Sequence, residues 1–229
     1  IADSERESDN AYLYGPQNTN QRIYNLISKH QIYRDLVTCR YLDYLNDRVF
    51  ERSTFHEKYG ISSIAAHLLG PGATSIPWHV DSILPDPIPS YMIRFICVIT
   101  LDEFTLSNGS TQYIPNSHLL KRKPTANDQD ILATRAECVT APPGSLIMWD
   151  GSLWHRSSEN RSNNMRGCLI LSFASSIFME ICGEEEHLTV VPGYLKGSMN
   201  QKLAQMIGHN RAVKKGSTYI PDYSNIISY

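Results

Sequence analysis

The sequence predicts one mostly β domain, a jelly roll with helical cover. Its 229 residues suffice for one sizeable core. Strand-sized apolar runs with turn signals between them recur from about residue 61 to 178, a pattern typical of a sandwich or barrel. We therefore expect a single domain over 1–229, with a core at about 61–178 and helical cover from 20–52 and the C-terminal segment 183–229.

The elements follow from local patterns along the chain. Residues 1–20 are polar and predict an irregular lead-in. Apolar residues at three- and four-residue steps over 20–52 predict two amphipathic helices, with a break near His30. A last helical pattern contains Met199, Leu203 and Met206. The predicted strands, separated by Gly, Pro and Asn-Gly turn signals, cover 61–69, 91–101, 110–114, 137–140, 145–149 and 166–174.

Composition excludes several classes of protein. With 21 Lys and Arg against 23 Asp and Glu, the chain lacks the basic excess of a nucleic-acid binder, so we expect no nucleic-acid partner. No apolar run reaches the ~18 residues of a membrane span, so we expect no membrane association. Five scattered Cys without a CxxC pair indicate reduced thiols in a cytoplasmic protein, and the polar first fifteen residues predict no signal peptide.

Three side chains form a candidate metal site. His79 and Asp81 are two residues apart, so in an extended segment both point to one side. His155, just after a predicted strand and a glycine, supplies a third ligand. Two His and one carboxylate on one face of an ion form the facial triad of non-haem Fe(II) oxygenases, which leaves positions open for co-substrate and oxygen.

Arg166 strengthens this interpretation. It lies eleven residues after His155 and opens the next predicted strand. If the two strands are adjacent, the guanidinium lies close to the metal. An Arg fork pairs bidentately with a carboxylate, and 2-oxoglutarate, which chelates iron through its 2-oxo acid end, needs such a partner at its other end.

The order of these motifs resembles the phytanoyl-CoA dioxygenase family of Fe(II)/2-oxoglutarate oxygenases. The resemblance covers about 61–178 and rests on His79-Val80-Asp81, Asn108-Gly109, 114–118 (IPNSH), 155–160 (HRSSEN) and Arg166. It implies a double-stranded β-helix with iron held by His79, Asp81 and His155. It also implies 2-oxoglutarate held by Arg166, with Ser157 against its carboxylate. Asn116 stands where the family's turn usually has Gly, and Asn tolerates the positive φ such a turn needs.

The resemblance further implies an oxidoreductase that uses Fe(II), 2-oxoglutarate and O2 to hydroxylate a small-molecule metabolite, with release of succinate. Related halogenases have Gly or Ala at the position of Asp81, so a carboxylate there favours hydroxylation, or desaturation, cyclisation or epoxidation, over halogenation. The fold is also shared with cupin-like metalloenzymes that do not use 2-oxoglutarate, which is the alternative function. A silent binding module of the same fold is a third.

The other His side chains have competing interpretations. His67 lies on the strand before His79 and either contacts the co-substrate or substrate or is a core histidine. His118 is expected to close a turn rather than bind metal. The sequence indicates neither the substrate nor the oligomeric state, because the segments expected to choose the substrate carry no readable motif.

Overall fold

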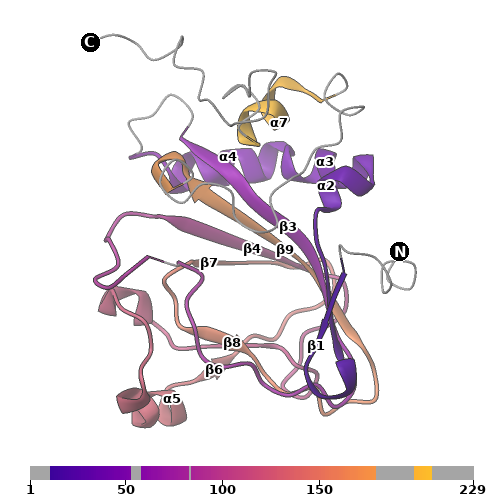
Figure 1. The fold of residues 1–229 in the computed structure, drawn as a ribbon, viewed down its shortest axis with the longest axis vertical. Coiled ribbons are helices and arrows are strands. Elements are labelled where there is room, and N and C mark those ends of the chain that lie inside the picture. Colours follow the sequence, from indigo (N-terminus) through magenta and orange to yellow (C-terminus); the bar gives the residue numbers. More distant parts are fainter. Residues whose placement is uncertain (1–10, 53–57, 83, 179–198, 208–229) are drawn as a thin grey trace, which may run out of the picture.

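The structure is a computed structural model that describes residues 11–52, 58–82, 84–178 and 199–207 (Figure 1). Its strands are β1 (Ala11–Tyr14), β2 (Asn20–Ile23), β3 (Tyr59–Leu69), β4 (Arg94–Thr100), β5 (Thr111–Tyr113), β6 (Glu137–Cys138), β7 (Leu146–Asp150), β8 (His155–Ser157) and β9 (Arg166–Ser175). Its helices are α2 (Leu26–Lys29), α3 (Gln31–Val37), α4 (Arg40–Val49), α5 (Gln129–Thr134) and α7 (Gln201–Met206), with short 3-10 turns η1 (Pro16–Asn18), η2 (Ser117–Leu120) and η3 (Ala126–Asp128).

Two antiparallel sheets form the layers of the domain. The larger sheet has the strand order β1-β2-β3-β9-β4-β7, and the smaller sheet has the order β6-β5-β8. In Figure 1 the helices α2, α3, α4 and α7 lie over one face of the larger sheet, and the smaller sheet lies on its other side. This arrangement confirms the predicted fold class, a jelly roll of the double-stranded β-helix type with helical cover.

Alternation along β9 assigns one face of the larger sheet to the core and the other to the interior between the sheets. Leu171 and Phe173 are fully buried and belong to the main apolar cluster, which also contains Leu42 from α4 and Leu203 from α7. Cys168 and Ser172 point to the opposite face, because successive residues of a strand alternate. The helices therefore seal one face of the sheet and leave the other for a site.

The predicted break near His30 is confirmed, but residues 20–52 contain three short helices rather than the two predicted. His30 is extended (φ −154°), and its Nδ1 accepts a hydrogen bond from the Ile32 N–H at 3.1 Å, which caps α3. A second break at Thr38 and Cys39 separates α3 from α4. Apolar spacing continues across this break, so periodicity alone does not reveal it.

The predicted start of the core at residue 61 is wrong. Residues 11–14 form β1 rather than part of a lead-in, and the segment expected to begin the helical cover starts with β2, which pairs with β3 from Asn20↔Leu69 to Ile23↔Ala66. These four-residue strands are too short to show a period, and β2 is held by a partner more than forty residues away. Much of the C-terminal segment 183–229 lies outside the described residues, but α7 confirms its helical pattern.

One strand, β8, was not predicted, because its three residues are too few to show alternation.

The cysteines agree with the expected reduced thiols. Cys39, Cys97, Cys138 and Cys168 are free thiols, and burial raises the pKa of Cys97 to about 12. Cys182 lies outside the described residues. Within the described part of the chain, no helix is long and apolar enough to cross a membrane.

Candidate metal centre and its pocket

Backbone pairing brings the two candidate histidine ligands together. His79 and His155 form an isolated antiparallel bridge, in which each N–H donates to the other residue's carbonyl, at 3.1 and 3.0 Å. Residues paired in this way project their side chains to the same face. The two rings accordingly lie with centroids 4.3 Å apart.

Asp81 is held on the same side by a second backbone anchor. Its N–H donates to the Gly151 carbonyl at 2.8 Å, and the Ser82 N–H donates to the same oxygen at 2.9 Å. Gly151 fits tightly here, because a Cβ would lie 2.8 Å from the Cβ of Arg94 and 3.0 Å from the Ser82 Oγ. The loop before β8 therefore fixes where the carboxylate points.

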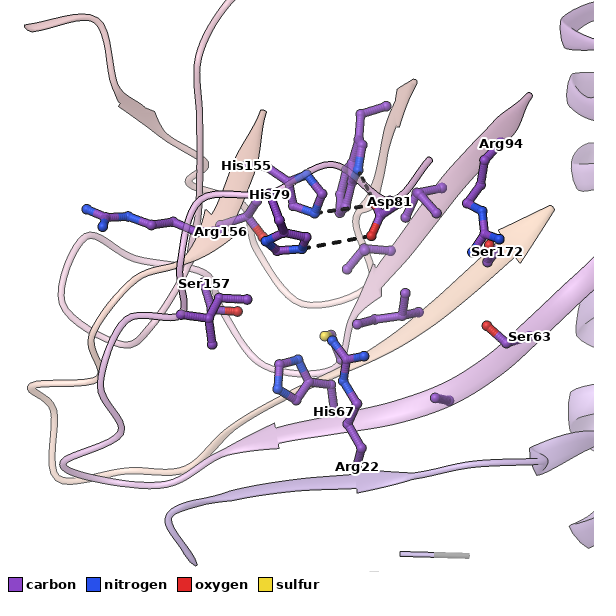
Figure 2. A pocket seen from close by; sticks show the side chains of 18 of the residues that line it. Arg22, Ser63, His67, His79, Asp81, Arg94, His155, Arg156, Ser157 and Ser172 are labelled. Atoms are coloured by element: carbon purple, nitrogen blue, oxygen red, sulfur yellow. Dashed lines mark hydrogen bonds and ion pairs between the residues drawn. The ribbon is translucent and has the colours of Figure 1, made fainter. Parts of the chain in front are cut away.

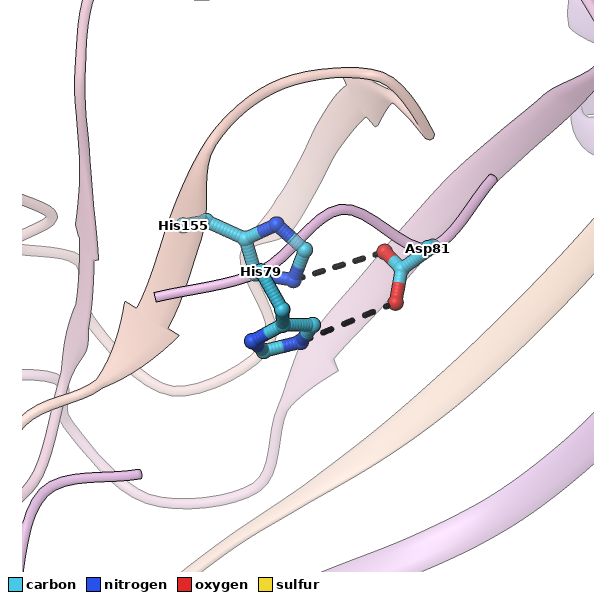
Figure 3. A group of neighbouring side chains, drawn as sticks. All are labelled: His79, Asp81 and His155. Carbon is cyan, nitrogen blue, oxygen red and sulfur yellow. Dashed lines mark ion pairs between the residues drawn. The ribbon is translucent and has the colours of Figure 1, made fainter. Parts of the chain in front are cut away.

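The three side chains converge as the spacing predicts (Figure 3). The His155 Nε2 lies 3.3 Å from the Asp81 Oδ2, and the His79 Nε2 lies 3.9 Å from the Asp81 Oδ1. One ligand atom from each of the three residues lies within 4.8 Å of the others. Two imidazole nitrogens and a carboxylate oxygen thus face one point in space.

The imidazoles are oriented as metal ligands require. The His79 Nδ1 lies 3.0 Å from the Pro77 carbonyl oxygen, and the His155 Nδ1 lies 2.9 Å from the Leu153 carbonyl oxygen. A carbonyl only accepts, so each Nδ1 carries the proton and each Nε2 offers a lone pair toward Asp81. Ligating histidines ordinarily donate their other N–H in this way. Burial and the nearby His155 lower the pKa of His79, which favours the neutral ring that a metal needs.

Asp81 has the charge state of a metal ligand. Burial raises its pKa, but the two imidazoles, the Trp149 indole and Arg94 outweigh burial and hold the pKa below its usual value. The Trp149 Nε1–H donates to the Asp81 Oδ2 at 3.2 Å, and its ring packs on His155 with centroids 5.0 Å apart. Sequence patterns do not reveal this bond, because its two residues lie 68 positions apart in the chain.

The triad lies in a cavity of about 170 Å³ between the two sheets (Figure 2). Residues expected to bind co-substrate line this cavity, namely Ser157 from β8, His67 from β3 and Arg166 from β9. His118 and Trp154 are not among its lining residues. Trp154 is fully buried and donates to the Arg122 carbonyl at 2.7 Å, so it packs the fold.

Arg166 is a buried cation in the pocket wall. Its side chain is 1% exposed, its guanidinium lies 4.4 Å above the Phe104 ring, and it donates to the Gly109 carbonyl and to the Cys168 Sγ. Arg166 opens β9 as predicted, but β8 and β9 are not adjacent, since they belong to different sheets. They face each other across the cavity, which still places Arg166 in the same pocket as the triad.

His67 is a buried neutral histidine that faces the pocket. It is 2% exposed, and burial, Arg22 and Arg166 hold its pKa well below the usual value. Strand register places Arg22 opposite His67 and His67 opposite Cys168. His67 is therefore both a core histidine and a residue that lines the cavity, so the two interpretations of its role do not exclude each other.

Sequence reasoning missed two arginines that line the pocket, Arg22 on β2 and Arg94 at the start of β4. Each stands in a strand position whose side chain alternation directs into the pocket, which is the only signal of this role in the sequence.

The turn before His118 has the backbone that the sequence predicts. Asn116 has φ 62°, so the positive φ expected at this turn is confirmed.

A model of the family described as Phytanoyl-CoA dioxygenase (PhyH) matches residues 6–168. The chain is 29% identical over 158 residues to "Dioxygenase trt7" of Aspergillus terreus, covering 65% of this chain and 52% of that protein. It is 35% identical over 124 residues to "Dioxygenase cdmD" of Talaromyces verruculosus, covering 52% of this chain and 36% of that protein. The chain thus spans about half, or less, of the length of these relatives.

Two solved structures resemble the fold. The crystal structure of EvdMO1 has a TM-score of 0.57 at 26% identity and covers 74% of this chain and 39% of that one. The structure described as the non-heme alpha ketoglutarate dependent epimerase SnoN from nogalamycin biosynthesis has a TM-score of 0.59 at 13% identity, covering 76% of this chain and 68% of that one. The second likeness is one of fold alone.

Proposed function

The chain belongs to the phytanoyl-CoA dioxygenase family, and from this premise we propose that it is an Fe(II)/2-oxoglutarate-dependent dioxygenase that hydroxylates a small-molecule metabolite. In this role it consumes O2 and converts 2-oxoglutarate to succinate and CO2. The observation that carries the proposal is the presence of a facial triad and a buried arginine in one cavity. The absence of nucleic-acid and membrane partners and the cytoplasmic location remain predictions from composition.

In the proposal, His79, Asp81 and His155 hold ferrous iron through their Nε2 atoms and carboxylate. Three ligands on one side leave positions open toward the cavity. When bound, Fe(II) supplies the oxygen activation that no amino-acid side chain can perform, with 2-oxoglutarate as electron donor. Asp81 fills the ligand position that the family's halogenases leave to chloride, so hydroxylation is favoured over halogenation.

The chain's own residues bind the co-substrate and shape the cavity. Arg166 binds the distal carboxylate of 2-oxoglutarate, because a planar guanidinium pairs with a carboxylate through two parallel N–H bonds. Ser157 and His67 contact the same molecule from the facing sheet and from β3. Trp149, Ile96 and Val98 line the wall near Asp81 and exclude water.

A cupin-like metalloenzyme that does not use 2-oxoglutarate is the second candidate. The same triad would serve such an enzyme. Arg166 argues against it, because a fully buried guanidinium is costly to desolvate and is typical of a site that binds an anion.

The test measures succinate formation by the purified chain with Fe(II), ascorbate and 2-oxoglutarate, alone and with metabolite pools. We expect succinate that depends on both Fe(II) and 2-oxoglutarate. His79→Ala should abolish it together with bound metal, and Arg166→Ala should raise the 2-oxoglutarate Kd at least about tenfold while metal stays bound. Arg34→Ala is the matched control, because this arginine also donates to a carbonyl, that of Ile27 at 2.6 Å, but outside the pocket.

Two results would contradict the proposal. If His79→Ala kept stoichiometric metal, the assigned triad would be wrong. If Arg166→Ala left 2-oxoglutarate binding unchanged, the assignment of Arg166 as the co-substrate ligand would be wrong, and the cupin-like alternative would be favoured over the proposed function.

A further inference from the structure

The pocket has a second polar end, which the proposed co-substrate does not occupy. The register of β3, β9 and β4 arranges the inward-facing residues of the larger sheet in rows. Ser63, Ser172 and Ile96 form one row, and Ala65, Ile170 and Val98 form the next. His67, Cys168 and Thr100 follow, and Arg166 lies beyond them. Arg94 stands two residues before Ile96 on the same face, so it joins Ser63 and Ser172 at the opposite end of the wall from Arg166.

We name the group Arg94, Ser63 and Ser172 the Arg94 end of the pocket. All three residues line the cavity, and Figure 2 shows the Arg94 side chain extending toward Ser172. The Arg166 guanidinium reaches Cys168, and from Cys168 to Ser172 is four residues of β9, or about 14 Å at ~3.4 Å per residue. A five-carbon diacid is on the order of 7 Å long. A 2-oxoglutarate molecule bound by Arg166 therefore leaves the Arg94 end for another molecule.

A β-bulge aims Ser63 into the pocket. The register of β3 against β9 shifts between Ile61 and Ser63, so Ile61 pairs with Phe173 while Ser63 pairs with Ser172. Without the extra residue, Ser62 would stand opposite Ser172 in place of Ser63. Bulges are frequent beside active sites, where they redirect a side chain. Here the bulge places two hydroxyls side by side across adjacent strands.

Ser172 offers an unused hydrogen-bonding group. Its side chain is 3% exposed, and its Oγ makes no hydrogen bond with any of the residues that the structure describes. A buried hydroxyl without a partner costs about 1–3 kcal/mol relative to a satisfied one. Such a cost is expected at a position where a ligand supplies the missing partner.

The backbone ties the Arg94 end to the metal site. The Gly151 N–H donates to the Arg94 carbonyl at 2.8 Å, and the Gly151 carbonyl accepts from the Asp81 N–H at 2.8 Å. The Arg94 guanidinium lies 4.9 Å above the Phe178 ring, and the side chain is 7% exposed. The backbone of Arg94 is therefore linked through Gly151 to that of Asp81, and both side chains line the same cavity.

We propose that the Arg94 end binds a carboxylate of the primary substrate. The adjoining row of Ala65, Ile170 and Val98 is apolar, so the substrate class is an amphipathic acid whose carbon skeleton lies along this row beneath the triad. The guanidinium supplies the charge and the donor fork, and the Ser172 and Ser63 hydroxyls supply further donors. This inference rests on the proposed function, because it needs Arg166 to hold the co-substrate.

The test uses calorimetric titration of the full chain loaded with Mn(II), which prevents turnover, in saturating 2-oxoglutarate. The probes are butanoate, octanoate, cyclohexanecarboxylate and benzoate, each paired with its neutral amide. We expect at least one acid to bind better than its amide. Arg94→Gln should weaken binding of that acid at least about tenfold, and Ser172→Ala by about three- to tenfold. Both should leave the amide Kd and the 2-oxoglutarate Kd within about twofold of the unsubstituted chain.

Two variants serve as controls, and Ser172→Ala provides a second test of the inference. Ser158→Ala removes another buried hydroxyl without a hydrogen bond among the described residues, but one that does not line the pocket, and it should change no affinity. Arg94→Lys keeps the charge and should retain part of the acid binding. Ser172→Ala removes a hydroxyl that has no hydrogen-bond partner in the described structure, so this variant should fold. It therefore tests the proposal even if Arg94→Gln does not fold.

The outcomes separate this inference from the proposed function. If no acid in the panel binds in an Arg94-dependent manner, or if Ser172→Ala and Arg94→Gln leave the acid Kd unchanged, the inference is wrong. If Arg94→Gln abolishes 2-oxoglutarate binding instead, the Arg94 end is a co-substrate site and the inference is also wrong. If acid binding depends on Arg94 while 2-oxoglutarate does not bind at all, the proposed function fails, and the Arg94 end is then an acid-binding site but not the substrate site of a 2-oxoglutarate-dependent dioxygenase.

Discussion

Replacing Trp149 by Phe tests whether the hydrogen bond to Asp81 supports metal binding. The substitution keeps an aromatic ring beside His155 and removes the Nε1–H that donates to the Asp81 Oδ2 at 3.2 Å. Nothing else in the described triad loses a hydrogen bond. The variant therefore probes one contact outside the ligand set.

The expected loss follows from the geometry. A hydrogen bond to a charged group contributes about 1.5–3 kcal/mol, which corresponds to roughly 10- to 100-fold in affinity. The 3.2 Å distance is at the long end of the usual range for N–H···O bonds. The Asp81 side chain is also 25% exposed, so water can replace part of the contact. We therefore expect the lower end, a roughly tenfold weaker affinity for Mn(II) or Fe(II).

Metal titration monitored by calorimetry under anaerobic conditions provides the measurement. Trp154→Phe is the matched control, because it also removes an indole hydrogen bond, to the Arg122 carbonyl at 2.7 Å, but outside the pocket. It should lower stability without changing metal affinity. A metal Kd for Trp149→Phe within twofold of the unsubstituted chain, or an equal loss in both variants, would refute the role of this bond.

Three further predictions concern residues outside the set of metal ligands. Asn160 is fully buried and its side chain makes four hydrogen bonds, to Leu69, Asn164 and twice to Ser162, so Asn160→Ala should cost about 2–4 kcal/mol and lower Tm by roughly 5–15 °C. Calorimetry compares the Tm of this variant with that of a control, Asn164→Ala, in which the substituted residue is exposed. Equal Tm values for the two variants would contradict the prediction. Arg122 donates to both Asp128 oxygens at 2.8 and 2.7 Å and, against the cost of burial, holds the Asp128 pKa well below its usual value. Because the folded-state pKa is lowered, this stabilisation is present at neutral pH and is lost as pH falls below about 4. Asp128→Asn should thus lower Tm most at pH 7 and progressively less as the pH falls below about 4 toward the lowered folded-state pKa, and a difference independent of pH would exclude this assignment. Gly151→Ala places a Cβ 2.8 Å from the Arg94 Cβ, so it should cost about 1–3 kcal/mol and weaken metal binding by displacing Asp81, an effect that unaltered metal titration would disprove.

The candidate metal site could be predicted because its signal is local. His79 and Asp81 are two residues apart, and the structure keeps both on one face of an extended segment. The position of His155 follows from one backbone bridge to His79. Arg166 was predicted in the pocket for a reason that proved partly wrong, since β9 faces β8 across the cavity rather than lying beside it.

The residues that sequence reasoning missed depend on long-range register. Arg94 and Ser172 become neighbours only when β4 pairs with β9, and Ser63 reaches them only through a bulge. The same limit explains β2, a four-residue strand placed by β3 rather than by its own pattern. Short strands carry little local preference, so tertiary pairing decides their structure.

The most direct test of the proposed chemistry is the fate of molecular oxygen. The purified chain is incubated with Fe(II), ascorbate and 2-oxoglutarate under ¹⁸O2, and the succinate is analysed by mass spectrometry. A 2-oxoglutarate-dependent dioxygenase places one oxygen atom of O2 in succinate as it decarboxylates 2-oxoglutarate. We expect singly labelled succinate that disappears in His79→Ala, and succinate that is unlabelled, or labelled equally in that variant, would contradict the proposed function.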